Sequence, residues 1–164
     1  MLLKFSLPAL AGAIASAILF TGSAFAAPTI VTVSLNNQSI TTDLPAGLGM
    51  AIPGADMSKA VMSVTAVPNV VRAGEISFAA TNNSTDYVHE MLLIKIDDPK
   101  AQLPFIADEL RVDEEAAGHM GEVAELDPGK SGTLTLTLDP GTYMLFCNIP
   151  GHYMAGMWTT VTVQ

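Results

Sequence analysis

The chain has 164 residues, of which 49% are hydrophobic and 14% charged, and its formal net charge at pH 7 is −9. Such an acidic surface would repel nucleic acid and anionic lipid, and it favours a basic protein partner. The length suits one domain with a sizeable core.

Residues 1–26 have the features of a secretory signal peptide. Lys4 precedes an uncharged apolar run that ends in Ala-Phe-Ala at residues 24–26, a pattern that signal peptidase accepts. The strongly apolar part is shorter than the roughly 20 residues of a membrane-spanning helix. We therefore expect a signal peptide over 1–26, a periplasmic mature protein without a stable membrane span, and a single domain over 27–164.

The mature sequence alternates between short apolar segments and turns. The segment 44–57 is rich in Gly and Pro and is expected to be a loop, with a short helix near Asp56. The segment 97–126 is expected to be mostly loop. The cleanest alternation is GTLTLTL at 132–138, where leucines face one side and threonines the other.

Seven segments in all are expected to be strands: residues 29–35, 61–67, 75–81, 87–96, 132–138, 140–147 and 157–163. About seven to eight strands, little helix and closely spaced turns predict an all-β fold, an antiparallel β-sandwich.

Cys147 is the only cysteine of the chain. An exported compartment is oxidising, and a single cysteine cannot form an internal disulfide there. A lone thiol in that setting is expected to be either buried or bonded to a metal.

The segment CNIPGHYMAGM, residues 147–157, places other metal-binding side chains near this thiol. Cys147, His152 and Met157 follow the order Cys-x4-His-x4-Met between two expected strands. One cysteine and two histidines in a plane, with a weak axial methionine, form the blue-copper arrangement. The loop therefore supplies three of four ligands and lacks one histidine.

The chain offers two further histidines for this position. His89 lies in a long apolar strand that can run beside the strand ending at Cys147. His119 lies in a segment where nothing fixes its position. We therefore predict His89 as the remaining ligand; a second, weaker copper site at His119 and Met120 is kept as a further option.

Two segments resemble the cupredoxins, the type 1 blue copper proteins. YMLFCNIPGHYMAGMWTTVTV at 143–163 resembles their C-terminal copper loop, with the spacing of the rusticyanin and sulfocyanin-type members. VRAGEISFAATNNSTDYVHEM at 71–91 is similar to the segment that carries their first histidine. The resemblance covers most of 61–164 and implies a Greek-key, cupredoxin-like sandwich.

The resemblance implies one copper per chain, cycling between Cu(I) and Cu(II), with His89, Cys147, His152 and Met157 as ligands. Met154 is too close to His152 for the family spacing.

One departure concerns the residue that follows the first histidine, which is an asparagine in several cupredoxins. Here it is Glu90. Side chains alternate along a strand, so Glu90 should point away from the copper.

Four protein ligands leave no open position for a substrate, so we expect an electron-transfer protein and not an enzyme. His152 is the expected electron port, within an apolar patch of Pro150, Gly151, Met154 and Ala155. The expected partner is a redox protein such as a c-type cytochrome or an oxidase, bound transiently. The alternatives are a copper carrier or chaperone, and a copper-binding accessory subunit of an oxidase.

Overall fold

The computed structural model of the chain describes residues 27–38 and 43–164. The expected signal peptide, residues 1–26, lies outside the described residues. Within the described ranges, the structure contains no helix with the length and apolar character needed to cross a membrane.

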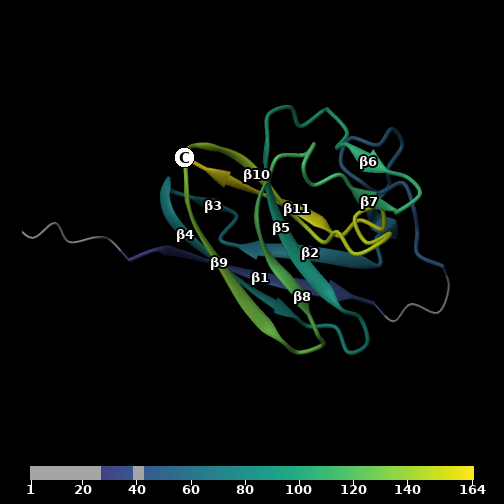
Figure 1. Cartoon of the computed structure of the whole chain (residues 1–164), viewed down its shortest axis with the longest axis horizontal. Coiled ribbons are helices and arrows are strands. Elements are labelled where there is room, and N and C mark those ends of the chain that lie inside the picture. Colours follow the sequence, from purple (N-terminus) through teal and green to yellow (C-terminus); the bar gives the residue numbers. More distant parts are fainter. Residues whose placement is uncertain (1–26, 39–42) are drawn as a thin grey trace, which may run out of the picture.

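The described residues form eleven strands and one short 3-10 helix. Figure 1 shows how the strands are arranged. The elements are β1 (Thr29–Asn37), η1 (Met57–Lys59), β2 (Met62–Val67), β3 (Val70–Val71), β4 (Gly74–Asn82), β5 (His89–Ile96), β6 (Phe105–Ile106), β7 (Arg111–Val112), β8 (His119–Leu126), β9 (Ser131–Leu138), β10 (Gly141–Phe146) and β11 (Trp158–Val163).

Two sheets form the sandwich, in the strand orders β2-β1-β4-β9 and β3-β11-β10-β5-β8, and β6 pairs with β7 in a separate ribbon. This confirms the predicted all-β fold. The strand count exceeds the expected seven to eight because β3, β6 and β7 are two residues long, and because β8 lies in 97–126, which was expected to be mostly loop.

The pairing is mixed, although an antiparallel sandwich was expected. β1 is parallel to β4, and β3 is parallel to β11, while the other neighbours are antiparallel. Parallel neighbours need a crossover connection instead of a tight turn. The chain between β1 and β4 runs through η1, β2 and β3, which provides that length.

The strands form where apolar residues alternate with polar ones. In β9 the threonines are exposed, Leu134 and Leu136 are half-buried, and Leu138 is fully buried, as the alternation predicted. β5 differs, because seven of its eight residues are buried. Both faces of β5 are covered, which explains its nearly continuous apolar sequence.

Two apolar clusters lie on opposite faces of the five-stranded sheet. The larger fills the space between the sheets and includes Phe78, Met91 and Cys147. The smaller includes Leu92, Ile94 and Phe146 and is covered in part by the segment around β6. Alternate residues of β5 therefore belong to different clusters.

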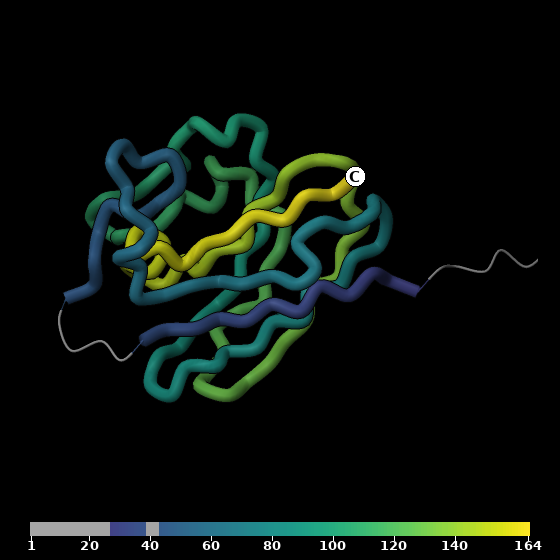
Figure 2. The backbone as a smooth tube through the Cα atoms, turned by 180° about the vertical axis from the view of Figure 1, so that it is seen from behind, coloured from purple at the N-terminus to yellow at the C-terminus, as the bar shows by residue number. Residues whose placement is uncertain are grey.

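Figure 2 shows the segment 43–60 lying against the loop between β10 and β11, at the end of the sandwich away from the C-terminus. This end carries the candidate site.

Candidate metal centre

The loop between β10 and β11 is closed by backbone hydrogen bonds. Cys147 directly follows β10 and Met157 directly precedes β11, and the Cys147 N–H donates to the Met157 carbonyl over 3.1 Å. Inside the loop, the N–H of Met157 donates to the carbonyl of His152, also over 3.1 Å. The strand pair thus fixes both ends of the loop, and the turn at His152 fixes its middle.

His89 is the first residue of β5, the strand beside β10. The turn before it is held by Asn82, whose side-chain N–H2 donates to the carbonyls of Tyr87 and Leu126, each over 2.8 Å. The same side chain accepts a bond from the Ser84 N–H over 2.9 Å. All polar groups of this fully buried amide are therefore used to position the start of β5.

His89, Cys147 and His152 converge, although 58 residues separate the first two. The two Nδ1 atoms lie 3.3 Å apart, and Cys147 Sγ lies 3.3 Å from His152 Nδ1 and 3.9 Å from His89 Nδ1. His89 and Cys147 have no exposed surface, and His152 is 3% exposed. His89 Nε2 is buried without a hydrogen-bond partner, so Nδ1 is the nitrogen of that ring that faces polar atoms.

These separations fit a trigonal metal site. Bonds of about 2.0 Å to nitrogen and about 2.3 Å to sulfur, typical of zinc in proteins, would place two nitrogens roughly 3.5 Å apart and a nitrogen and a sulfur roughly 3.7 Å apart. The three ligand atoms lie within a few tenths of an ångström of this pattern. The donor set, one thiolate and two imidazoles, is the one that suits copper in its trigonal blue-copper geometry.

Burial determines the charge of these side chains before a metal enters. It raises the pKa of the Cys147 thiol to about 12. It lowers the pKa of both imidazoles to about 4, and at His152 the neighbouring His89 adds to the effect. The imidazoles are therefore neutral at pH 7 and ready to bind a metal, whereas the thiol must lose its proton as the metal binds.

Glu90 contacts the site through its backbone only. Its N–H donates to Cys147 Sγ over 3.4 Å. By strand alternation, its side chain belongs to the sheet face opposite that of His89, which stays a prediction. The carboxyl group is buried with Oε1 unpaired, and its pKa rises to about 7 through burial and, secondarily, through the nearby Glu122 carboxylate.

The two candidate axial methionines lie in different surroundings. Met157 has no exposed surface and belongs to the same core cluster as Cys147. Met154 packs instead on the segment around Gly49, where a Cβ on residue 49 would lie 3.1 Å from Met154 Sδ. This placement favours Met157, whose role as axial ligand stays a prediction.

His119 does not join the three converging side chains. It begins β8, where it lies opposite Ile94 and 4.0 Å from a Glu122 carboxylate oxygen. The preference for His89 over His119 therefore agrees with the geometry.

Residues 44–57 form a clamp on the metal loop, a role that sequence reasoning missed. The Leu48 N–H donates to the Met154 carbonyl, and the Trp158 indole N–H donates to the Leu48 carbonyl over 2.8 Å. The Tyr153 hydroxyl accepts a bond from the Met50 N–H over 2.9 Å. Nothing in the Gly- and Pro-rich sequence of this segment indicated its docking site.

Asn148 also holds the loop in place and was not singled out from the sequence. Its side chain accepts from the Val112 N–H over 2.7 Å and donates to the Val112 carbonyl and to Glu114 Oε1. In the sequence, only its position directly after Cys147 could have indicated this role. The pair of bonds to Val112 ties β7 to the metal loop.

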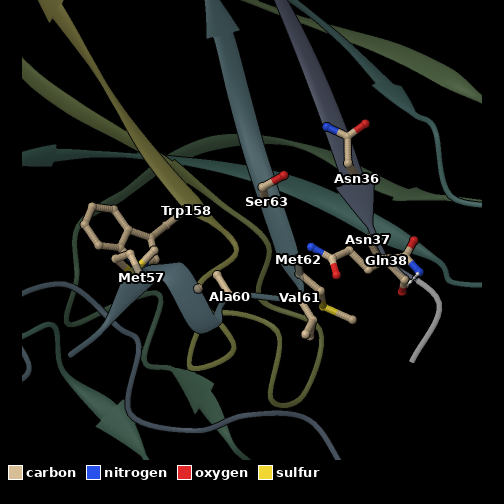
Figure 3. A pocket seen from close by; sticks show the side chains of 10 residues that line it. Asn36, Asn37, Gln38, Met57, Ala60, Val61, Met62, Ser63 and Trp158 are labelled. Atoms are coloured by element: carbon tan, nitrogen blue, oxygen red, sulfur yellow. Dashed lines mark hydrogen bonds between the residues drawn. The ribbon is translucent and has the colours of Figure 1, made fainter. Parts of the chain in front are cut away.

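Two pockets flank the loop. One, of about 340 Å³, has a largely apolar lining formed by Leu44, Pro45, Ala46, Phe105, Leu110, Pro150, Gly151 and Met154. The other, of about 310 Å³, lies beside Gly156 and Trp158; Figure 3 shows Met57 and Trp158 on one side of it and Asn36, Asn37 and Gln38 on the other. Ala155, expected in the apolar surface patch, is instead fully buried.

A β-sandwich whose two histidines and one cysteine converge at one end defines a class of mononuclear copper proteins. The family of copper binding proteins described as the plastocyanin/azurin family matches residues 56–164, and the chain belongs to that family. It is a cupredoxin, and His89, Cys147 and His152 form its candidate type 1 copper site.

Two relatives are similar over short stretches. Auracyanin-B of Chloroflexus aurantiacus is 54% identical over 41 residues, which are 24% of this chain and 17% of that protein. The copper-resistant cuproprotein CopI of Pseudomonas aeruginosa is 55% identical over 40 residues, 24% of this chain and 22% of that protein. The chain thus matches less than a quarter of the length of either relative.

Solved structures show the same fold. Reduced auracyanin from the photosynthetic bacterium Roseiflexus castenholzii superposes with a TM-score of 0.50 and 20% identity, over 85% of this chain and 98% of that chain. Reduced rusticyanin superposes with a TM-score of 0.51 and 15% identity, over 85% and 82% of the two chains. The predicted likeness to rusticyanin is thereby confirmed at the level of the fold.

Proposed function

We propose that the chain is a periplasmic blue copper protein that carries single electrons between redox partners and is not itself an enzyme. The observation that carries this proposal is the complete or nearly complete burial of His89, Cys147 and His152, at distances suited to one copper ion. Met157 is proposed as the axial fourth ligand. Bound copper would supply a one-electron couple between Cu(I) and Cu(II).

The protein around the site resists rearrangement. Cys147 and Met157 are joined by a backbone hydrogen bond, and the clamp of residues 44–57 adds bonds to Met154, Tyr153 and Trp158. A rigid set of ligands reduces the reorganisation that accompanies each electron transfer. Four protein ligands would also leave no position for a substrate, which favours electron transfer over catalysis.

The apolar pocket beside His152 supports transient docking of a partner. Leu110 is 52% exposed at its rim, and the Leu110 carbonyl accepts a bond from the Gly151 N–H over 2.9 Å, directly before His152. We propose that this surface meets a redox protein such as a c-type cytochrome or an oxidase. The acidic net charge would steer a basic partner toward the chain.

The test uses residues 27–164 loaded with Cu(II). We expect an intense visible thiolate-to-copper band and a type 1 EPR signal, both lost in Cys147→Ala and kept in the control His119→Ala. Stopped-flow mixing with a reduced c-type cytochrome should then bleach the band in a second-order reaction. A colourless wild-type protein would exclude the type 1 site. A blue protein that exchanges no electrons with the cytochrome would exclude the role of electron carrier.

A copper carrier is the second candidate, because a relative over 40 residues is described as a copper-resistant cuproprotein. Complete burial of His89 and Cys147 argues against rapid release of the metal. Mixing the copper-loaded protein with a copper-free acceptor protein separates the two functions. Transfer of copper faster than exchange of electrons would favour the carrier.

A further inference from the structure

We propose that Glu114, His119 and Glu122 form a second cation site, suited to a divalent ion such as Zn²⁺, on the outer face of the five-stranded sheet. One ligand atom of each residue lies within 4.8 Å of the others. This site is separate from the copper site and uses no residue of it.

A bulge in β8 brings His119 and Glu122 to the same face. Residues three apart in a regular strand point to opposite faces. Here the pairing with β5 shifts register between Leu93 and Ile94, so that Glu122 lies opposite Leu92 and His119 opposite Ile94. Leu92 and Ile94 both belong to the smaller apolar cluster, on the sheet face away from the copper ligands. Bulges of this kind commonly redirect side chains at functional sites.

Glu114 is placed by the turn that precedes β8. Its carbonyl accepts a bond from the His119 N–H over 3.0 Å. Its Oε1 accepts a bond from the Asn148 side chain over 2.9 Å, which leaves Oε2 for a cation. The third ligand is therefore held on both its backbone and its side chain.

Glu90 provides an independent indication that a cation belongs here. It is 6% exposed, and its Oε1 has no hydrogen-bond partner. By strand alternation its side chain lies on the same face as Leu92 and hence as Glu122. A buried, unpaired carboxyl oxygen is costly, and a cation among these groups would offset that cost.

The chemistry of the donor atoms suggests the kind of ion. One imidazole with carboxylates suits zinc and other divalent first-row transition metals, whereas a set of oxygen ligands alone would suit magnesium or calcium. Bonds of about 2.1 Å would bring His119 Nε2 and Glu122 Oε2 to roughly 3.0–3.4 Å from each other. They are 4.0 Å apart, and side chains that are 27% and 40% exposed have room to close this gap.

The test is calorimetric titration of Zn²⁺ into untagged residues 27–164 with the copper site filled by Cu(I). We expect one equivalent to bind, at least tenfold more weakly in His119→Gln and in Glu122→Gln. Glu125→Gln, on the same strand but outside the ligand set, is the matched control and should bind as the wild type does. Retention of the blue band after reoxidation shows that each variant is folded.

Two results would overturn the proposal. One is equal zinc binding by the wild type and both ligand variants, or none by any of them. The other is zinc uptake accompanied by loss of the blue band, since the ion would then occupy the copper site.

Discussion

The backbone N–H of Glu90 donates a hydrogen bond to the sulfur of Cys147 over 3.4 Å, and so joins β5 to the metal loop across 57 residues. Donors to a ligand sulfur stabilise its negative charge and tune the metal that it binds. Because the bond comes from the backbone, the identity of side chain 90 does not control it. We therefore predict that Glu90→Gln leaves the position of the blue band unchanged, as measured by visible spectroscopy; a clear shift would contradict this.

The same variant should change how stability depends on pH in the copper-free protein. His89 and His152 have a pKa of about 4 when folded and an ordinary value of 6.5. Their contribution to the free energy of unfolding is therefore lost as pH falls from 6.5 toward 4. Glu90 acts in the opposite direction, because folding raises its pKa from 4.5 to about 7. Its contribution to the free energy of unfolding is therefore lost as pH rises from 4.5 toward 7. Two imidazoles outweigh one carboxyl group between pH 4.5 and 6.5, so the free energy of unfolding should increase with pH there.

Urea denaturation across this pH range measures the effect. Removing the carboxyl group in Glu90→Gln should steepen the increase by up to about 1.4 kcal/mol per pH unit, the slope for one proton. An unchanged slope in the variant would show that the Glu90 carboxyl is already ionised across this pH range.

Replacement of the two loop methionines should have unequal effects on the copper. Met157 is buried beside Cys147, whereas Met154 packs on Gly49. Loss of a weak axial donor favours Cu(I), so Met157→Leu should raise the reduction potential. A tenfold change in the preference of the site for Cu(I) over Cu(II) corresponds to about 59 mV. Voltammetry of Met154→Leu, which keeps the volume change the same, should give the wild-type potential. A raised potential in Met154→Leu and a wild-type potential in Met157→Leu would identify Met154 as the axial ligand instead.

The clamp can be tested by removing one hydroxyl group. Tyr153→Phe leaves the buried Met50 N–H unpaired, at a cost of about 1–3 kcal/mol in unfolding free energy. It should also broaden the EPR signal, since the clamp holds the metal loop. Tyr143→Phe is the matched control, because Tyr143 donates to the Asp139 carbonyl before the start of β10. We expect it to lose stability with an unchanged EPR signal, and equal broadening in both would rule out the clamp.

Docking at the apolar pocket predicts a kinetic effect without a spectroscopic one. Leu110 has a φ of 56°, which Asn tolerates better than most residues, so Leu110→Asn removes apolar surface without new backbone strain. The second-order rate constant for electron exchange with a c-type cytochrome should fall several-fold while the spectrum stays the same. Ile30→Thr, at a 63% exposed position on β1, should exchange electrons at the wild-type rate. Equal rate constants for Leu110→Asn and Ile30→Thr would show that the partner does not dock at this pocket.

Local patterns predicted the parts of the fold that short-range order controls. The alternation at 132–138 placed β9 correctly, and the long, largely apolar segment 87–96 indicated the interior strand β5. β8 was missed because His119–Leu126 is mostly exposed and contains a bulge, so its apolar residues do not alternate. Its strand character depends on pairing with β5, which propensity alone does not report.

The sequence by itself determined the identities and order of the candidate copper ligands Cys147, His152 and Met157, because a short loop between paired strands confines all three. It also indicated His89, because a long apolar strand can run beside the strand that ends at Cys147. Only the tertiary structure brought His89 to within 3.9 Å of Cys147, docked residues 44–57 on the metal loop and gathered Glu114, His119 and Glu122. The first two of these contacts join residues far apart in the chain, and the third needs a bulge in β8. All three depend on strand register and on side-chain positions that form only when the sheets are assembled.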